Sequence, residues 1–157
     1  MSYTQPPHLA DEEIESFLKN ANVARFCSLN ADGTIHAVPV WYSYLDKKFA
    51  VATPFSSLKA RNVRRNGNVT LLIDASETRG VWPKGVVIYG QGELDKTDLA
   101  LPEFTSLCEK YIMDGKAESY ARGLLSLARW VKIVVTPKHM ASFDYTKDQA
   151  YKTATGE

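Results

Sequence analysis

The stretch from Thr53 to Arg65 contains the residue types that bind a phosphate group. A β-type run ends in the hydroxyl of Thr53, a short turn follows, and Ser56 or Ser57 can cap the start of a helix. The unpaired N–H groups at a helix start carry partial positive charge and favour an anion. The three hydroxyls can donate hydrogen bonds to phosphate oxygens. The segment is therefore a candidate phosphate site.

Lys59 lies in the first turn of this expected helix, where the helix dipole favours an acidic residue. A cation there costs about a few tenths of a kcal/mol, unless a bound anion lies between it and the helix end. This local mismatch is the strongest evidence for phosphate binding that the residues themselves provide. The alternative is a serine-capped surface helix with a solvated basic face. Spacing alone leaves both interpretations open.

Composition and charge exclude several classes of protein. The 157 residues fit one ordinary globular domain, spanning 1–157. A net charge of +1 argues against general nucleic-acid binding, which needs a broad basic surface. No apolar run approaches the ~20 residues of a membrane span, and the start lacks a signal-peptide pattern. Cys27 and Cys108 have no metal-ligand spacing and are interpreted as buried, reduced thiols. We expect a cytoplasmic protein that binds no nucleic acid, membrane or metal.

The pattern along the chain predicts few helices and six strands: Val23–Leu29, Ile35–Leu45, Phe49–Thr53, Val69–Asp74, Gly85–Leu94 and Trp130 to about Tyr145. Helices are expected at Asp11–Asn20, with Asp11 as its cap, from Ser56 or Ser57 to Asn66, and over most of Asp98–Leu127 with a break near Asp114 and Gly115. Gly90 and Gly92 within a strand indicate a bulge or bend. These features suggest a closed or nearly closed antiparallel barrel.

Several motifs, taken in order, resemble the pyridoxamine 5′-phosphate oxidase-like family. The first two are IHAVPVWY at Ile35–Tyr42 and a short strand ending in Thr53. SLKARNVRRN at Ser57–Asn66 follows, and then the strand Val69–Asp74. The later segments Gly85–Glu93, Lys132–Pro137 and Ser142–Tyr145 also resemble family strands. The resemblance covers roughly residues 20 to 146 without a large insertion.

The resemblance implies a mainly β fold: a six-stranded antiparallel split β-barrel of Greek-key type with a few peripheral helices, paired as a homodimer. It also implies FMN in the groove between the subunits, with its phosphate held by Lys59, Ser57 and Arg64 or Arg65. The backbone from Val38 to Trp41 would line the isoalloxazine ring. The cofactor-binding residues expected in this way are Val38, Pro39, Val40, Trp41, Thr53, Ser56, Ser57, Leu58, Lys59, Arg64 and Arg65.

The chain departs from the true oxidases at the positions that concern their substrate. His36 stands where those enzymes carry an arginine, and Leu58-Lys59 replaces their Arg-Lys pair. Their arginine-bearing C-terminal segment has no counterpart after Tyr145. Oxidation of pyridoxamine phosphate is therefore not expected, whereas the proposed flavin contacts are retained.

The leading hypothesis is an FMN-dependent oxidoreductase that acts on an unidentified small molecule, with a nicotinamide cofactor as a candidate electron donor. A second hypothesis keeps the fold but replaces FMN with a deazaflavin, whose longer acidic tail would require extra basic residues along the groove, which Arg61, Arg64, Arg65 and Lys84 could supply. A third is a flavin- or haem-binding carrier or sensor without turnover. Trp82 is a candidate to cover the groove, with simple packing as the alternative. The pattern names no catalytic residue.

Overall fold

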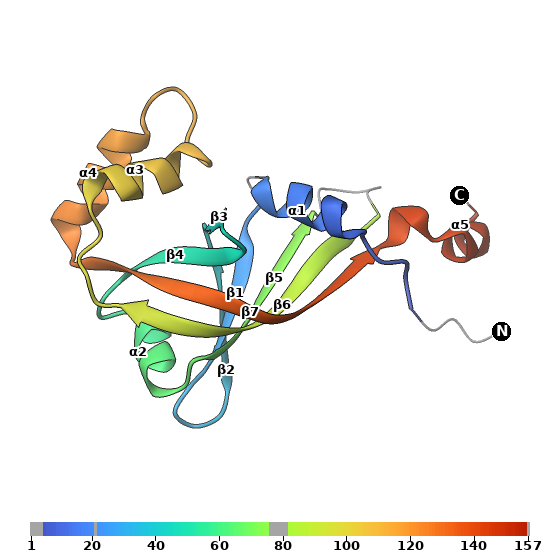
Figure 1. The fold of residues 1–157 in the computed structure, drawn as a ribbon, viewed down its shortest axis with the longest axis horizontal. Coiled ribbons are helices and arrows are strands. Elements are labelled where there is room, and N and C mark those ends of the chain that lie inside the picture. The colour runs from blue at the N-terminus through green and yellow to red at the C-terminus, as the bar shows by residue number, and fades with distance from the viewer. Residues whose placement is uncertain (1–4, 21, 76–81, 157) are drawn as a thin grey trace.

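The computed structural model describes residues 5–20, 22–75 and 82–156. These residues form a seven-stranded antiparallel sheet, in the order β2-β1-β5-β6-β7-β4-β3 (Figure 1). The strands are β1 (Ala24–Leu29), β2 (Ile35–Val40), β3 (Ser43–Leu45), β4 (Lys48–Pro54), β5 (Asn68–Ala75), β6 (Lys84–Asp95) and β7 (Trp130–Asp144). The helices are α1 (Asp11–Lys19), α2 (Leu58–Arg65), α3 (Leu101–Glu109), α4 (Ala117–Leu127) and α5 (Gln149–Thr155).

The sheet curls into a half-barrel because its two edge strands are neighbours in sequence. β2 and β3 lie at opposite ends of the strand order, yet only Trp41 and Tyr42 separate them along the chain. A connection this short spans only about 10 Å, so the two edges must approach each other. β6 bends where its register with β7 shifts, between Tyr89 and Gly90. A Cβ at Gly90 would lie 2.9 Å from the Thr136 carbonyl oxygen, so this close approach requires glycine.

The expectation of six strands is wrong by one, because residues 35–45 do not form a continuous strand. The backbone of Tyr42 is bonded by side chains instead of by a neighbouring strand. Its N–H donates to the hydroxyl of Tyr111 (3.1 Å), and its carbonyl accepts from the ammonium of Lys110 (3.3 Å). The chain therefore leaves the β2 ladder at Val40 and joins the opposite edge at Ser43.

The helices differ from expectation mainly at their ends. Asp11 is the first residue of α1 instead of its cap, which is Ala10; the Ala10 N–H donates to Glu13 Oε2 (2.7 Å). The expected break in the later helical segment is confirmed: it falls between α3 and α4, where Asp114 and Gly115 have positive φ. α5, beyond the last strand, was not predicted.

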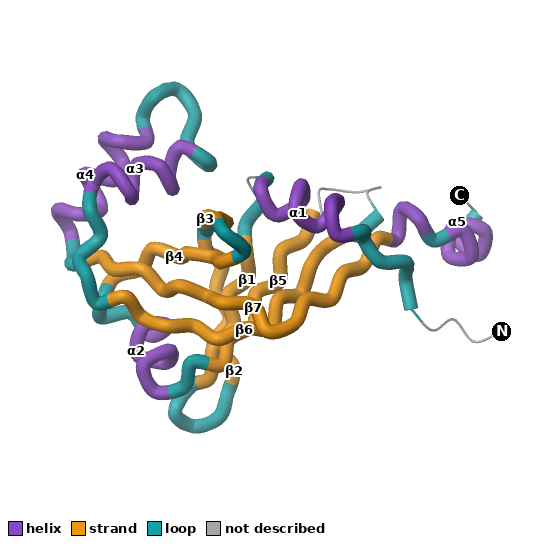
Figure 2. Tube along the Cα trace, in the orientation of Figure 1, coloured by secondary structure: helices purple, strands orange, loops and turns teal. Residues whose placement is uncertain are grey.

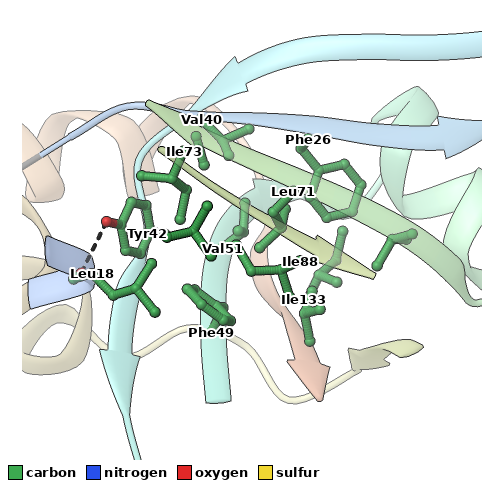
Figure 3. Close-up of a cluster of buried hydrophobic side chains, with 14 of the residues drawn as sticks. Leu18, Phe26, Val40, Tyr42, Phe49, Val51, Leu71, Ile73, Ile88 and Ile133 are labelled. Atoms are coloured by element: carbon green, nitrogen blue, oxygen red, sulfur yellow. Dashed lines mark hydrogen bonds between the residues drawn. The ribbon is translucent and has the colours of Figure 1, made fainter. Parts of the chain in front are cut away.

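The main core fills the concave side of the sheet (Figure 3). Aromatic and branched side chains from most strands meet there and are fully buried, among them Phe26, Tyr42, Phe49, Val51, Leu71, Ile88 and Ile133. The hydroxyl of Tyr42 donates to the carbonyl of Leu18 (2.9 Å), which ties α1 to this core (Figure 3). Because strand residues alternate between faces, Ala50, Ala52 and Pro54 of β4 lie on the other side.

A second, smaller core lies on that other side. α3 and α4 form a helical hairpin (Figure 2) whose buried residues are Phe104, Cys108, Ala117 and Ala121. Trp41, Ala52 and Trp130, from the sheet and the β2–β3 connection, pack against these residues. The hairpin is thus held against the outer face of the sheet beside β4 and β7.

Candidate functional site

A cavity of about 360 Å³ lies between the outer face of the sheet and the α3–α4 hairpin. Its walls are mostly apolar and aromatic: Val23, Pro39, Val40, Trp41, Ala52, Pro54, Phe104, Leu107, Tyr120, Leu124 and Trp130. Lys59 is the one charged side chain among the described residues that line it. Small-molecule sites typically have this size and combine apolar walls with a few polar groups. The cavity suits a planar, largely apolar ring that carries an anionic group.

The segment expected to line a flavin ring is partly in this cavity. Pro39, Val40 and Trp41 line it, whereas Val38 packs against the main core. The indole of Trp41 stacks on the ring of Tyr111, with centroids 4.8 Å apart and planes 2° apart. Trp41 therefore presents a wall whose orientation is set by packing outside β2.

Two of the hydroxyls expected at the phosphate contact each other. Ser57 caps α2, and its Oγ accepts from the N–H of Ala60 (3.2 Å). The same Oγ lies 2.8 Å from Oγ1 of Thr53, which is fully buried. The cap fixes the start of α2 relative to the end of β4. Neither hydroxyl lines the cavity, but Ser57 directly precedes the turn that carries Lys59.

Lys59 is the polar anchor of the cavity. It lies in the first turn of α2, which contains no acidic residue. Within the described part of the chain, no ion pair or hydrogen bond is made by its ammonium group. Burial lowers the pKa of Lys59 because the charged form loses water. A bound anion would offset this loss and also face the positive end of the helix.

The remaining predicted residues on and before α2 point in different directions. Ser56 and Leu58 are exposed. The guanidinium of Arg64 lies over the ring of Phe55, 4.7 Å from its centroid, and Arg129 lies over the same ring at 4.3 Å. Arg65 donates to the carbonyl of Leu29 and to Oδ1 of Asn62, away from the cavity. Of the two arginines, Arg64 is therefore the one that contacts Phe55, the residue that follows the cavity-lining Pro54 in the chain.

The helical wall of the cavity was not identified from the sequence. Tyr120 and Leu124 are four residues apart on α4 and so share one helix face. Trp130 begins β7, and its indole N–H donates to the carbonyl of Leu124 (2.9 Å), which attaches α4 to the sheet. The helical spacing was a signal for an apolar face. It did not indicate which part of the sheet that face would cover.

Other sequence candidates lie elsewhere. Trp82 packs edge-on against Tyr151 of α5, with ring centroids 5.1 Å apart. The ammonium of Lys84 lies over Phe17 of α1, so it is not available at the cavity. In the described ranges, no three His, Cys, Asp or Glu side chains gather as a metal site would require. No described helix is long and apolar enough to cross a membrane.

Comparisons with known proteins identify the family of the chain and confirm its fold. The sequence model of the pyridoxamine 5′-phosphate oxidase family matches residues 10–136. In sequence searches, no curated protein matches the chain significantly.

Solved structures share the fold. The conserved hypothetical protein Rv2991 from Mycobacterium tuberculosis is 22% identical, with a TM-score of 0.74 and 91% of each chain covered. An FAD-binding protein from Mesorhizobium loti is 19% identical, with a TM-score of 0.62 over 88% of this chain and 97% of that one. An F420 reductase is 18% identical, with a TM-score of 0.61 over 83% and 98%. The expected split-barrel fold is confirmed, and the chain belongs to the pyridoxamine 5′-phosphate oxidase family.

Proposed function

We propose that this protein binds FMN in the cavity under the α3–α4 hairpin, with the phosphate at Lys59. The observation that carries the proposal is that Lys59, a partly buried lysine without a partner among the described residues, lines a mostly apolar cavity. A solvated surface helix would not explain why this ammonium lines a cavity. The family match and the FAD-binding structure similar to this chain support a flavin-type ligand.

The residues present fit such a ligand. Pro39, Trp41 and Trp130 offer apolar contact to a planar ring, and Lys59 offers a charge-assisted hydrogen bond to a phosphate oxygen. The α3–α4 hairpin excludes water from one side of the ring. When bound, the flavin supplies the electron-transfer chemistry, and the protein supplies binding and position. We infer an oxidoreductase of a small molecule, with a nicotinamide as candidate electron donor.

The binding test is a titration of the purified protein with FMN and with riboflavin, which lacks the phosphate. We expect FMN to bind at least about tenfold more tightly, because a charge-assisted hydrogen bond is worth about 1.5–3 kcal/mol. Equal affinities would contradict the phosphate site. The visible absorption of the protein as purified provides a second check. A haem Soret band in place of flavin bands would favour the carrier or sensor hypothesis.

A deazaflavin is the second candidate, because two arginines gather on Phe55, which follows the cavity-lining residue Pro54 in the chain. Arg64 and Arg129 both stack on Phe55, and Arg129 also bonds Asp98 (2.5 Å). Arg64 makes no ion pair within the described residues, so it is available to an acidic tail. Replacing Arg64 with Ala should weaken deazaflavin binding and leave FMN binding unchanged. Equal effects on both ligands would remove the argument for this candidate.

We also propose that two copies of the chain form a homodimer. Ile35 and Tyr89 are 71% and 48% exposed and line a second hollow of about 320 Å³ on the outside of the sheet. Exposed apolar side chains gathered in this way favour association. Light scattering at micromolar concentration should give the dimer mass. A monomer mass there would contradict the homodimer.

A further inference from the structure

The two residues that join the edges of the sheet are held by the end of α3. Tyr42 has no strand partner, so its backbone groups need other partners. The Tyr111 hydroxyl accepts from the Tyr42 N–H (3.1 Å) and lies 3.1 Å from the Tyr42 carbonyl and 3.0 Å from that of Asn22. Its single proton can therefore be donated to either carbonyl. One side chain thus fixes the path of this connection.

The same side chain sets the orientation of Trp41. The Trp41 and Tyr111 rings are nearly parallel, and Trp41 also meets Tyr120 at 5.7 Å with a 40° tilt. Trp41 and Tyr120 both line the cavity, whereas Tyr111 lies behind Trp41 and does not. Tyr111 therefore supports a ring that any planar ligand in the cavity would meet.

Lys110 completes the arrangement from the next position. Its ammonium donates to the Tyr42 carbonyl (3.3 Å) and lies 3.7 Å from the centroid of the Tyr42 ring and 5.4 Å from that of Tyr111. No carboxylate pairs with it in the described part of the chain. Two aromatic faces and one carbonyl dipole thus hold a charge that has lost much of its water. A purely structural contact would be satisfied at lower cost by an apolar side chain.

We propose that Lys110 and Tyr111 are positioning residues that fix the angle of Trp41 and thereby determine how tightly the cavity holds a planar ring. The inference rests on the proposed flavin site and concerns its ring end, whereas Lys59 concerns its phosphate end. The two proposals therefore predict different effects on FMN and riboflavin affinity. Weakening this support should reduce riboflavin and FMN affinity by the same factor, because both ligands share the ring.

The first test compares Tyr111→Leu, Tyr111→Phe and the control Lys116→Met, which alters an exposed lysine on the same hairpin. Tyr111→Leu removes the stack and the hydroxyl, so both flavins should bind about two- to tenfold more weakly. Tyr111→Phe keeps the stack and should show a smaller loss, and Lys116→Met should show none. A Tyr111→Leu variant that melts earlier but binds both flavins like the parent would overturn the proposal.

The second test measures riboflavin affinity as a function of pH. If Lys110 had only a structural role, its titration would not change this affinity. Burial lowers the pKa of Lys110 to about 8, whereas the groups facing it, Tyr42 and Tyr111, have raised pKa values and stay neutral. Riboflavin affinity of the parent should fall by about two- to fivefold as pH rises from about 7 to 9, when the cation–π contact is lost. Lys110→Arg should keep the affinity high across this range, and Lys110→Met should keep it low. Parallel pH profiles in all three proteins would overturn the proposal.

A measurement on the ligand-free protein tests the positioning of Trp41 independently of flavin binding. Near-ultraviolet circular dichroism reports the asymmetric packing of Trp41, whose bands are identified by their loss in Trp41→Phe. Tyr111→Leu should change those bands, and Lys116→Met should not. Unchanged bands would overturn the positioning role even if flavin binds. A parent protein that binds neither flavin would instead remove the proposed function, while changed bands would still support the hold on Trp41.

Discussion

Alternate residues of β4 face two different regions: the main core, which is filled, and the cavity, which is open. On the concave side, Phe49 and Val51 are fully buried in the main core. On the outer side, Ala52 and Pro54 line the cavity, where small side chains leave space. Because strand side chains alternate between faces, neighbouring residues can separate stability from binding. Large side chains fill the inner face of β4, whereas small side chains leave space on its outer face, where we propose that the ligand binds.

The partly buried lysines also fall into two groups, those with and those without an acidic partner. Lys59 and Lys110, beside the cavity, have no acidic partner among the described residues, and burial lowers both pKa values. Lys132, which joins β7 to α3, lies 2.6 Å from Glu103 and 3.7 Å from Asp95, and these carboxylates raise its pKa. The paired lysine has a structural explanation within the chain. Under the proposed function, the unpaired Lys59 holds the phosphate and the unpaired Lys110 helps to position Trp41.

The largest effect is expected on the inner face. Phe49→Ala removes a fully buried ring that contacts the rings of Tyr42 and Tyr44, at 5.7 Å and 4.7 Å between centroids. The free energy of unfolding should fall by about 3–5 kcal/mol, because apolar contact is lost and a cavity remains. Denaturant unfolding of the ligand-free protein measures this change.

Ala52→Leu on the same strand is the matched test of the outer face. The larger side chain enters the cavity, so FMN should bind at least about tenfold more weakly, a loss of about 1.4 kcal/mol. The free energy of unfolding should change much less than in Phe49→Ala. If Ala52→Leu destabilised the fold equally, or left FMN binding intact, the division between the two faces would not hold.

At the phosphate end of the proposed site, the effect of Lys59 on FMN binding should be of similar size or larger. Lys59→Ala removes a charge-assisted hydrogen bond worth about 1.5–3 kcal/mol, so FMN affinity should fall about ten- to a hundredfold. Riboflavin affinity should hardly change. Stability without ligand should stay level or rise slightly, because a cation leaves the positive end of α2. Calorimetric titration of both flavins measures these differences.

Arg61→Ala is the control for Lys59, since Arg61 is an exposed cation on the same helix. It should leave FMN affinity within about twofold, because an exposed charge acts only through a screened field. Equal FMN affinity in Lys59→Ala and the parent would end the phosphate-site proposal.

The local parts of the fold could be predicted from the sequence. The β-type runs bounded by turn residues located β4, β5 and β6, and the bend at Gly90 followed from glycine within a strand. The serine cap of α2 was also predictable, because capping depends on residues three or four apart. Lys59 could be selected for the same reason: its mismatch with the helix dipole is visible in one turn of sequence.

The long-range parts could not be predicted. Tyr42 reads as a strand residue, but Lys110 and Tyr111, almost 70 positions later, bind its backbone and divide the strand. The helical wall of the cavity depends on which sheet face α4 covers, and spacing does not encode that choice. Arg65 and Arg64 are adjacent cations in sequence, yet only Arg64 lies beside Phe55. Side-chain direction on a short helix was decided by tertiary contacts.

Lys110 provides a test in which stability and binding should respond to pH in opposite directions. Its pKa is about 8 in the folded protein, below the ordinary value of 10.5, so the unfolded chain binds more protons in this window. The free energy of unfolding should therefore rise with pH from about 8 towards 10 through this group. Lys110→Met should remove that rise, although riboflavin binding to the parent weakens as the pH rises from about 7 to 9.

The measurement is denaturant unfolding of the parent and Lys110→Met at several pH values. The two cysteines have raised pKa values and act in the opposite sense, so the difference between the proteins isolates Lys110. A constant difference across the window would show that Lys110 keeps one protonation state and would contradict its role as a buried, unpaired cation.

The smallest effect is expected at the paired lysine. Glu103→Gln removes the carboxylate 2.6 Å from Lys132 and leaves Asp95 at 3.7 Å, and all three side chains keep contact with solvent. Partly exposed ion pairs contribute about 0.2–1 kcal/mol, so unfolding should be slightly easier at low salt and nearly unchanged at high salt. Flavin affinity should not change, because neither Glu103 nor Lys132 lines the cavity. If Glu103→Gln weakened FMN and riboflavin equally, the attachment of α3 to the sheet would also set the shape of the ring site. Contacts in the first turn of α3 would then also affect the position of Trp41, as those of Lys110 and Tyr111 do. The paired Lys132 and the unpaired Lys110 would both help to shape the ring site.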